Sequence, residues 1–209
     1  MNLLHKNGKK KKPLSKKRIV LLDGHPAQES LSKALTLRYA NYARKGGHEV
    51  RIHHLSEYDF DMDFEFSKYS DAKTLEPDLE QFIADLKWAN HFFLCTPMWW
   101  GSFPAKLKGL IDRSFLPGSV FDTHVKKGKM PKPMLKDITG RVIVTSDTPR
   151  WVMNLIYRNA LINQLKGQVL GFIGIKPTKI TWCAGAGSAD KKKIDQWLGE
   201  IEKLGYSAT

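Results

Sequence analysis

Residues 19–32 have the sequence IVLLDGHPAQESLS, in which four apolar residues lead into a short polar turn. The apolar run is rich in β-branched residues and ends at Asp23-Gly24, a pattern typical of a buried strand followed by a turn. Residues 30–44 then place apolar side chains at helical spacing, and Gly46-Gly47 follows them as a helix stop. The stretch therefore predicts a strand–loop–helix unit, the first half of a βαβ crossover.

The same alternation continues along the rest of the chain. We expect further strands over residues 49–55, 91–96, 141–145 and 179–183, and further helices over residues 75–88, 104–115, 151–172 and 190–204. Strands separated by helices predict an α/β protein with a parallel sheet covered on both faces, either a flavodoxin-like doubly wound five-stranded fold or a half-Rossmann relative. Ligands of such folds bind at the carboxyl ends of the strands, which directs attention to the loops over residues 23–32, 97–103 and 146–151.

Composition agrees with one globular domain. The chain has 209 residues, of which 42% are hydrophobic and 26% charged, and a chain of this size can bury a core without disulfides. Cys95 and Cys183 lie in apolar runs and are expected to be buried free thiols. No apolar run reaches the roughly 18 residues of a transmembrane helix, and no secretory signal is recognisable. We therefore expect a cytoplasmic protein rather than a disulfide-rich, membrane-spanning or mainly disordered one.

Positive charge is concentrated at the N-terminus. The formal net charge is +13, but residues 1–18 hold eight basic groups and no acid, which leaves 26 basic and 21 acidic groups for the rest. Residues 1–17 have too few apolar side chains to pack, so we expect a disordered basic tail before a domain over residues 18–209. Because the tail lacks aromatic residues for base stacking, no specific nucleic-acid partner is predicted. A weak contact with nucleic acid, a membrane surface or an acidic partner stays open.

The loop over residues 24–32 joins the first strand to the first helix. A helix N-terminus presents unpaired N–H groups and the positive end of the helix dipole, which suit a phosphate, and His25, Ser30 and Ser32 add donors. The loop matches neither the G-x-G-x-x-G fingerprint nor a P-loop. The alternative is that Ser30 only caps the helix while Ser32 faces solvent. Glu29 is expected to point outward.

Two adjacent tryptophans, Trp99 and Trp100, follow the third strand. Indoles at a strand end call for a large flat apolar partner, which could be an isoalloxazine ring or a second subunit. Gly101 would let the backbone approach such a ring closely. The alternative is that both indoles pack against the neighbouring helix.

The fourth strand ends in Thr145-Ser146-Asp147-Thr148. Its hydroxyls and turn N–H groups could hold the polar pyrimidine edge of a flavin. The alternative is that Asp147 or Thr148 caps the helix that begins near Pro149. The later Gly-Ala-Gly-Ser stretch over residues 185–188 is expected to be a plain turn.

No metal site is predicted. His53 and His54 would face opposite sides of a strand, and the aspartates over residues 59–63 form no evident oxygen cage. No Cys, His or carboxylate set has the spacing of a zinc site.

Residues 97–113, PMWWGSFPAKLKGLIDR, closely resemble the signature P-x-x-W-x-x-x-P-A-x-L-K-G-x-I-D-R of the flavodoxin-like NAD(P)H:quinone oxidoreductase family. That family also includes azoreductases and the flavoprotein subunits of potassium-efflux systems. His25-Pro26 followed by Ser30 and Ser32 resembles its phosphate loop, and residues 118–121 resemble a segment near its active-site rim. The resemblance covers residues 17–205.

The resemblance implies a flavin bound at all three loops. In the family the first loop binds the flavin phosphate, the second lies along the isoalloxazine, and the third binds its pyrimidine edge. Carried onto this chain, these positions are His25, Ser30, Leu31 and Ser32; Pro97, Met98, Trp99, Trp100 and Gly101; and Ser146, Asp147 and Thr148. Such a phosphate loop accepts FMN or FAD, and FMN is favoured because no separate adenine pocket is recognisable. The flavin carries the chemistry, so no catalytic side chain is assigned.

The resemblance further implies a homodimeric enzyme that transfers hydride from NAD(P)H through the flavin to a quinone or similar acceptor in a ping-pong sequence. Residues 145–148 depart from the Thr-Thr-Gly-Gly turn of the mammalian-type members. The Tyr and His that follow that turn there have no match here, and Tyr157 is a candidate substitute. The alternative function is a non-catalytic flavin-binding protein that regulates, or transfers electrons to, another protein. The choice between NADH and NADPH and the identity of the acceptor are not visible in the sequence.

Overall fold

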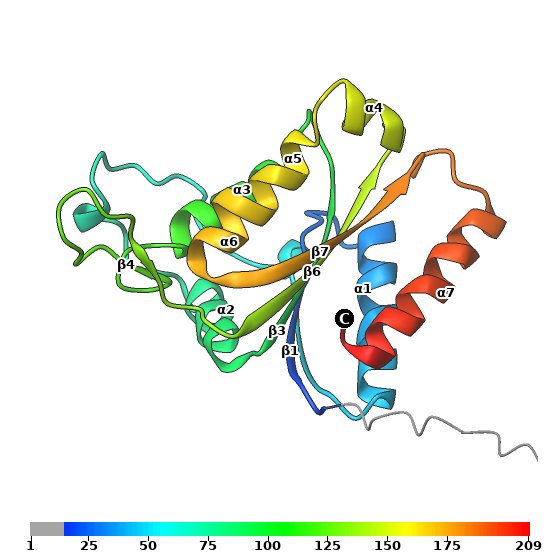
Figure 1. Ribbon diagram of the computed structural model, residues 1–209, viewed down its shortest axis with the longest axis horizontal. Helices are drawn as coiled ribbons and strands as arrows, with labels where there is room; N and C mark the ends of the chain where they lie inside the picture. The colour runs from blue at the N-terminus through cyan, green and yellow to red at the C-terminus, as the bar shows by residue number, and fades with distance from the viewer. Residues whose placement is uncertain (1–14) are drawn as a thin grey trace, which may run out of the picture.

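A computed structural model describes residues 15–209 as a five-stranded parallel sheet between two layers of helices (Figure 1). The strand order is β2-β1-β3-β6-β7, with every neighbouring pair parallel. This order reverses direction at β1, as in a flavodoxin-like fold, and confirms that prediction. The bounds are Arg18–Asp23 for β1, Glu49–His54 for β2, His91–Pro97 for β3, Ile138–Ser146 for β6 and Ile175–Ala184 for β7.

Alternate residues of the central strands face two separate cores, because successive side chains of a strand point to opposite faces. Ile19 and Leu21 pack beneath α1 and α7, whereas Val20 and Leu22 pack on the side of α2 and α3. Figure 1 shows these two helical layers on either side of the sheet. The bounds are Leu31–Lys45 for α1, Pro77–Trp88 for α2, Ala105–Ser114 for α3 and Lys191–Ser207 for α7.

The single helix predicted over residues 151–172 is wrong. The chain instead forms α4 (Arg150–Leu155), α5 (Ala160–Asn163), a π-helical turn (Gln164–Val169) and α6 (Leu170–Ile173). Arg158 and Asn159 adopt φ values of 46° and 55°, and this left-handed pair breaks the helix. Gly171 follows the π-helical turn. A Cβ at this position would lie 2.3 Å from the Lys166 carbonyl oxygen, so the turn requires a glycine there. The apolar residues of this segment therefore do lie on helical turns, but the helix is interrupted.

Two loops on the α3 side carry structure that the sequence pattern did not predict. Within residues 117–136 a short hairpin forms between β4 (Phe121–Asp122) and β5 (Lys132–Pro133). The loop after β2 contains two 3₁₀ turns, Leu55–Glu57 and Tyr69–Asp71. Arg113 of α3 holds this loop: its buried guanidinium donates to the Glu76 carboxylate at 3.0 Å and to the Thr74 carbonyl at 3.2 Å.

Both cysteines are buried free thiols, as predicted. Burial raises the pKa of Cys183 to about 12 and also raises that of Cys95, which keeps both sulfurs protonated. Between residues 15 and 209 no group of potential metal ligands occurs, and no helix there is long and apolar enough to cross a bilayer.

The predicted basic tail lies mostly outside the described residues. Of its last residues, Lys16 pairs with Glu49 at 3.2 Å, and the Lys17 ammonium donates to the Ala208 carbonyl at 2.8 Å.

A buried histidine joins the sheet to α1. His91 Nε2 lies 3.0 Å from the Tyr39 hydroxyl and Nδ1 lies 2.6 Å from Thr139 Oγ1. Burial lowers the pKa of His91 to about 3, because a charged imidazole would lose its hydration there. The folded protein therefore holds this ring neutral at pH values where the unfolded chain binds a proton.

We predict that acid destabilises the fold partly through His91. Below pH 6.5 the unfolded chain takes up a proton that the folded chain refuses until about pH 3, so stability is lost as the pH falls through this window. The loss from this residue is about 1.4 kcal/mol per pH unit. Urea unfolding at pH 7, 6 and 5 should show a shallower pH dependence for His91→Gln than for the wild type. An equal slope in the two proteins would contradict the prediction.

Candidate functional site

The carboxyl ends of β1, β3 and β6 lie side by side and bring the three predicted loops to one edge of the sheet. The Gly24 N–H donates to the Cys95 carbonyl at 2.8 Å, which joins the first loop to β3. The Met98 N–H donates to the Thr145 carbonyl at 2.8 Å, which joins the second loop to β6. Figure 1 shows this edge at the top of the sheet, near the start of α1 and below α4.

In the first loop Ser30 and Ser32 have different roles. Ser30 is the N-cap of α1, and its Oγ accepts the Lys33 N–H at 3.0 Å, as the capping alternative proposed. Ser32 does not face solvent: it is 1% exposed, and its hydroxyl lies near the Cys95 thiol but has no well-formed hydrogen bond among the described residues. An unpaired buried hydroxyl costs about 1–3 kcal/mol, so a ligand that bonded it would recover that cost. Glu29 is exposed, as predicted.

His25 is oriented by the backbone that follows it. The Ala27 N–H donates to His25 Nδ1 at 3.0 Å, so the neutral ring carries its proton on Nε2 and can donate from that atom. The ring lies edge-on to Trp99, with centroids 5.5 Å apart. The first and second loops thus meet through an imidazole that has a free donor.

The second loop is a tight turn that exposes its tryptophans. Trp99 and Ser102 exchange two backbone hydrogen bonds of 2.8 and 2.9 Å, and between them Trp100 and Gly101 have φ values of 52° and 76°. Two positive φ values form a type I′ turn, which Gly accepts but Trp resists. Trp100 is fully exposed and Trp99 is 44% exposed. The alternative that both indoles pack against the neighbouring helix is therefore wrong. Pro97 at the strand end is buried and Met98 is half-buried.

The third loop is held by its own side chains and does not cap a helix. The buried Ser146 Oγ accepts the Thr148 N–H at 3.0 Å, and Asp147 Oδ1 accepts the Gly187 N–H at 2.6 Å. Helix α4 begins after Pro149 without a side-chain cap, so the capping alternative is wrong. The loop keeps a compact turn of polar groups beside the second loop.

A fourth segment, residues 185–188, completes this edge, and the sequence assigned it only as a turn. The Ala186 N–H donates to the Ser146 carbonyl at 3.2 Å, in addition to the Gly187–Asp147 bond. Trp182 of β7 reaches the same loop, because its Nε1 donates to the Thr148 carbonyl at 3.2 Å. The sequence feature that could have revealed this segment was the pair of glycines, Gly185 and Gly187, directly after β7.

A buried carboxylate lies beneath the first loop. Asp23 ends β1 and is 0% exposed; its Oδ1 accepts the His25 N–H at 3.2 Å, and its Oδ2 lies 3.3 Å from His54 Nδ1. Burial raises the pKa of Asp23, while the bonds to His25 and His54 oppose that rise. His53 precedes His54 in β2 and points to the opposite face of the sheet, as the alternation of side chains along a strand predicted. Its Nε2 lies 2.9 Å from the Asp85 carboxylate.

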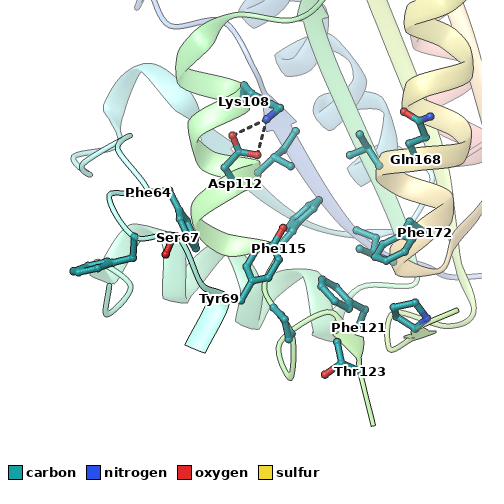
Figure 2. Close-up of a pocket in the computed structure, with 16 residues that line it drawn as sticks. Phe64, Ser67, Tyr69, Lys108, Asp112, Phe115, Phe121, Thr123, Gln168 and Phe172 are labelled. Carbon is teal, nitrogen blue, oxygen red and sulfur yellow. Dashed lines mark hydrogen bonds and ion pairs between the residues drawn. The ribbon is translucent and has the colours of Figure 1, made fainter. Parts of the chain in front are cut away.

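A cavity lined by aromatic residues lies away from the three loops. It has a volume of about 820 Å³ between α3, the 64–69 segment, the β4–β5 hairpin and α6 (Figure 2). Aromatic rings dominate its wall, and the Lys108–Asp112 ion pair of 2.6 Å lies at its edge. None of the residues carried over as flavin ligands lines it; Phe121, from the segment that resembles the active-site rim, does.

Comparison with known proteins agrees with this architecture. A curated relative, the FMN-dependent NADH:quinone oxidoreductase of Aeromonas salmonicida, is 30% identical over 128 residues. The match covers 60% of this chain and 62% of that protein, so the chain spans less than two thirds of the relative's length.

Solved structures share the fold. The NAD(P)H:quinone oxidoreductase of Methanothermobacter marburgensis superposes with a TM-score of 0.79 at 18% identity, over 93% of this chain and 98% of that one. The FMN-dependent NADH-azoreductase of Bacillus anthracis, solved in complex with FMN, superposes with a TM-score of 0.68 at 15% identity, over 90% and 97% of the two chains. A family model described as the flavodoxin-like fold matches residues 17–204. The chain therefore belongs to the flavodoxin-like fold family that this model describes.

Proposed function

We propose that the chain is an FMN-dependent oxidoreductase that passes electrons from NAD(P)H to a quinone-like acceptor. The observation that carries the proposal is the buried, unpartnered hydroxyl of Ser32 at the start of α1, beside exposed indoles on the next loop. An anion site next to a flat apolar surface is the combination that a flavin mononucleotide requires. The fold family and the activity for which the Aeromonas relative is named support the same choice.

The donors of the first loop fit a phosphomonoester. The first N–H groups of an α-helix have no intrahelical partner, and Ser30 Oγ takes only that of Lys33. Leu31 and Ser32 would offer backbone N–H groups, Ser32 its hydroxyl, and His25 the proton on Nε2. The positive end of a 15-residue helix dipole adds to this attraction.

The second and third loops fit the ring. Pro97, Met98, Trp99, Trp100 and Gly101 would lie along the isoalloxazine, and the left-handed turn at Trp100-Gly101 presents apolar surface and backbone together. Ser146, Asp147 and Thr148 would offer polar groups to the pyrimidine edge. Bonds from the 185–188 segment and Trp182 hold that turn in place, so its backbone is ordered before a ligand arrives.

Bound FMN would supply the redox chemistry, hydride acceptance from NAD(P)H and two-electron transfer to the acceptor in a ping-pong sequence. The chain's own contribution is to anchor the phosphate, to keep one face of the ring accessible and to place polar N–H groups where negative charge develops on reduction. No side chain is required as an acid or base in this scheme.

We also propose that the protein works as a homodimer. Near the carboxyl ends of the strands Trp100 is exposed, and so are apolar residues of α4 and the turn after it: Trp151, Leu155, Ile156 and Tyr157, each 56% exposed or more. Large apolar side chains exposed in such number favour an interface with a second subunit. We expect light scattering at micromolar concentration to give twice the chain mass. Leu155→Glu should shift the mass toward the monomer, whereas a wild-type monomer would contradict the proposal.

The cofactor prediction is tested by binding. The purified protein should be yellow and release FMN on heating. Loss of the Ser32 hydroxyl should weaken FMN affinity by about tenfold, because a hydrogen bond to a charged group is lost, and should leave riboflavin affinity unchanged. Ser56→Ala is the matched control, since Ser56 also has a buried unpartnered hydroxyl but lies in the loop after β2. Equal effects of Ser32→Ala and Ser56→Ala would argue against a phosphate at α1.

The enzyme prediction is tested by turnover. NADH or NADPH should be consumed in the presence of menadione by the FMN-loaded protein and not by the protein without FMN. Trp100→Ala should lower turnover, because it removes apolar surface next to the ring. A yellow protein that binds FMN but consumes neither nucleotide would instead favour the non-catalytic flavin-binding alternative.

A further inference from the structure

The pair formed by Asp23 and His54 has no role in the function proposed above. A fully buried carboxylate at a strand end is costly unless another group compensates it. Here the carboxylate accepts the His25 N–H, and the His25 imidazole is one of the proposed phosphate donors, so two negative charges would flank His25. Such an arrangement opposes anion binding unless a neighbouring donor offsets the charge of the carboxylate.

His54 is placed to provide that compensation. β1 and β2 pair in register so that Asp23 lies opposite His54, and the imidazole Nδ1 lies 3.3 Å from the carboxylate. The other ionisable groups that act on this carboxylate are His25 in the loop and the Cys95 thiol on β3. Cys95 stays uncharged because burial raises its pKa, and His25 Nδ1 already accepts the Ala27 N–H. His54 is therefore the side chain whose donor can offset the Asp23 charge.

The geometry points to a charge-compensating pair: Asp23 orients the anion loop through the His25 N–H, and His54 offsets the Asp23 charge through the contact of its Nδ1 with the carboxylate, so that the loop accepts a phosphomonoester. Both are positioning residues, because neither is placed against the ligand itself. The inference rests on the proposed FMN site and adds the residues that set its affinity for the phosphate rather than for the ring.

Two substitutions of this pair should act in opposite directions. Asp23→Asn keeps the oxygen that accepts the His25 N–H but removes the negative charge, so FMN should bind as tightly as in the wild type or more tightly. His54→Gln leaves the Asp23 charge uncompensated, so FMN should bind more weakly. The FMN dissociation constant of His54→Gln should exceed that of Asp23→Asn by at least about threefold, the effect of one unit charge at a partly screened distance.

The experiment is a fluorescence-quenching titration of the flavin-free full-length protein with FMN and, separately, with riboflavin at pH 7 and low salt. Riboflavin lacks the phosphate, so its affinity should be the same in both variants. His53→Gln is the matched control, because it alters a second buried Asp–His pair on the opposite face of the same strand, and it should not separate FMN from riboflavin. Melting curves establish that each variant is folded.

A difference between the two variants of less than about threefold for FMN, or an equal difference for riboflavin, overturns the inference and leaves the proposed function in place. Loss of affinity for both ligands in both variants also overturns the inference, because it indicates that the pair has only a structural role. Failure of the unaltered protein to bind FMN overturns the proposed function, and the inference with it.

Discussion

The site depends on the parallel pairing of β1, β3 and β6. Parallel hydrogen bonding fixes the register of neighbouring strands, and here it aligns the ends of three strands so that Gly24 bonds to Cys95 and Met98 bonds to Thr145. Loops that are far apart in sequence therefore begin from adjacent points on one rigid edge. The two apolar cores stabilise the sheet from both faces, and the loops gain their positions from that rigidity rather than from contacts of their own.

Three departures from ordinary stability rules lie at this same edge. Ser32 leaves a buried hydroxyl unpaired, Trp100 adopts a left-handed conformation with its indole in solvent, and Asp23 buries a carboxylate. Elsewhere His91 bonds to Tyr39 and Thr139, and Arg113 bonds to Glu76 and Thr74. Ser56, in the loop after β2, is the other buried hydroxyl without a partner among the described residues. Local conflicts of this kind often persist where binding requires them, so they favour this edge as the candidate site over the cavity beside α3.

Much of the fold was predictable because strands and turns leave strong local patterns. The five apolar runs and the residues that end them located the sheet, and Ser30 and Gly46 marked the bounds of α1. The prediction over residues 151–172 failed because apolar spacing does not reveal a left-handed residue pair: Asn159 breaks the helix and is held by hydrogen bonds with Arg150 and Asn154. Residues 185–188 were predicted only as a turn, because the sequence pattern does not show that Gly187 bonds to Asp147, which is remote in sequence.

The order of apolar runs and the loop residue types were sufficient to predict the class of fold and the three loops, because these properties depend on local chemistry. The family resemblance carried by residues 97–113 added the prediction of a flavin ligand. Tertiary structure alone decided that Ser32 is buried without a partner, that the indoles are exposed, and that His54 faces Asp23 while His53 faces Asp85. Such facts depend on which neighbours the sheet brings together. A side chain's burial and partners are properties of the packed whole, and no window of sequence contains them.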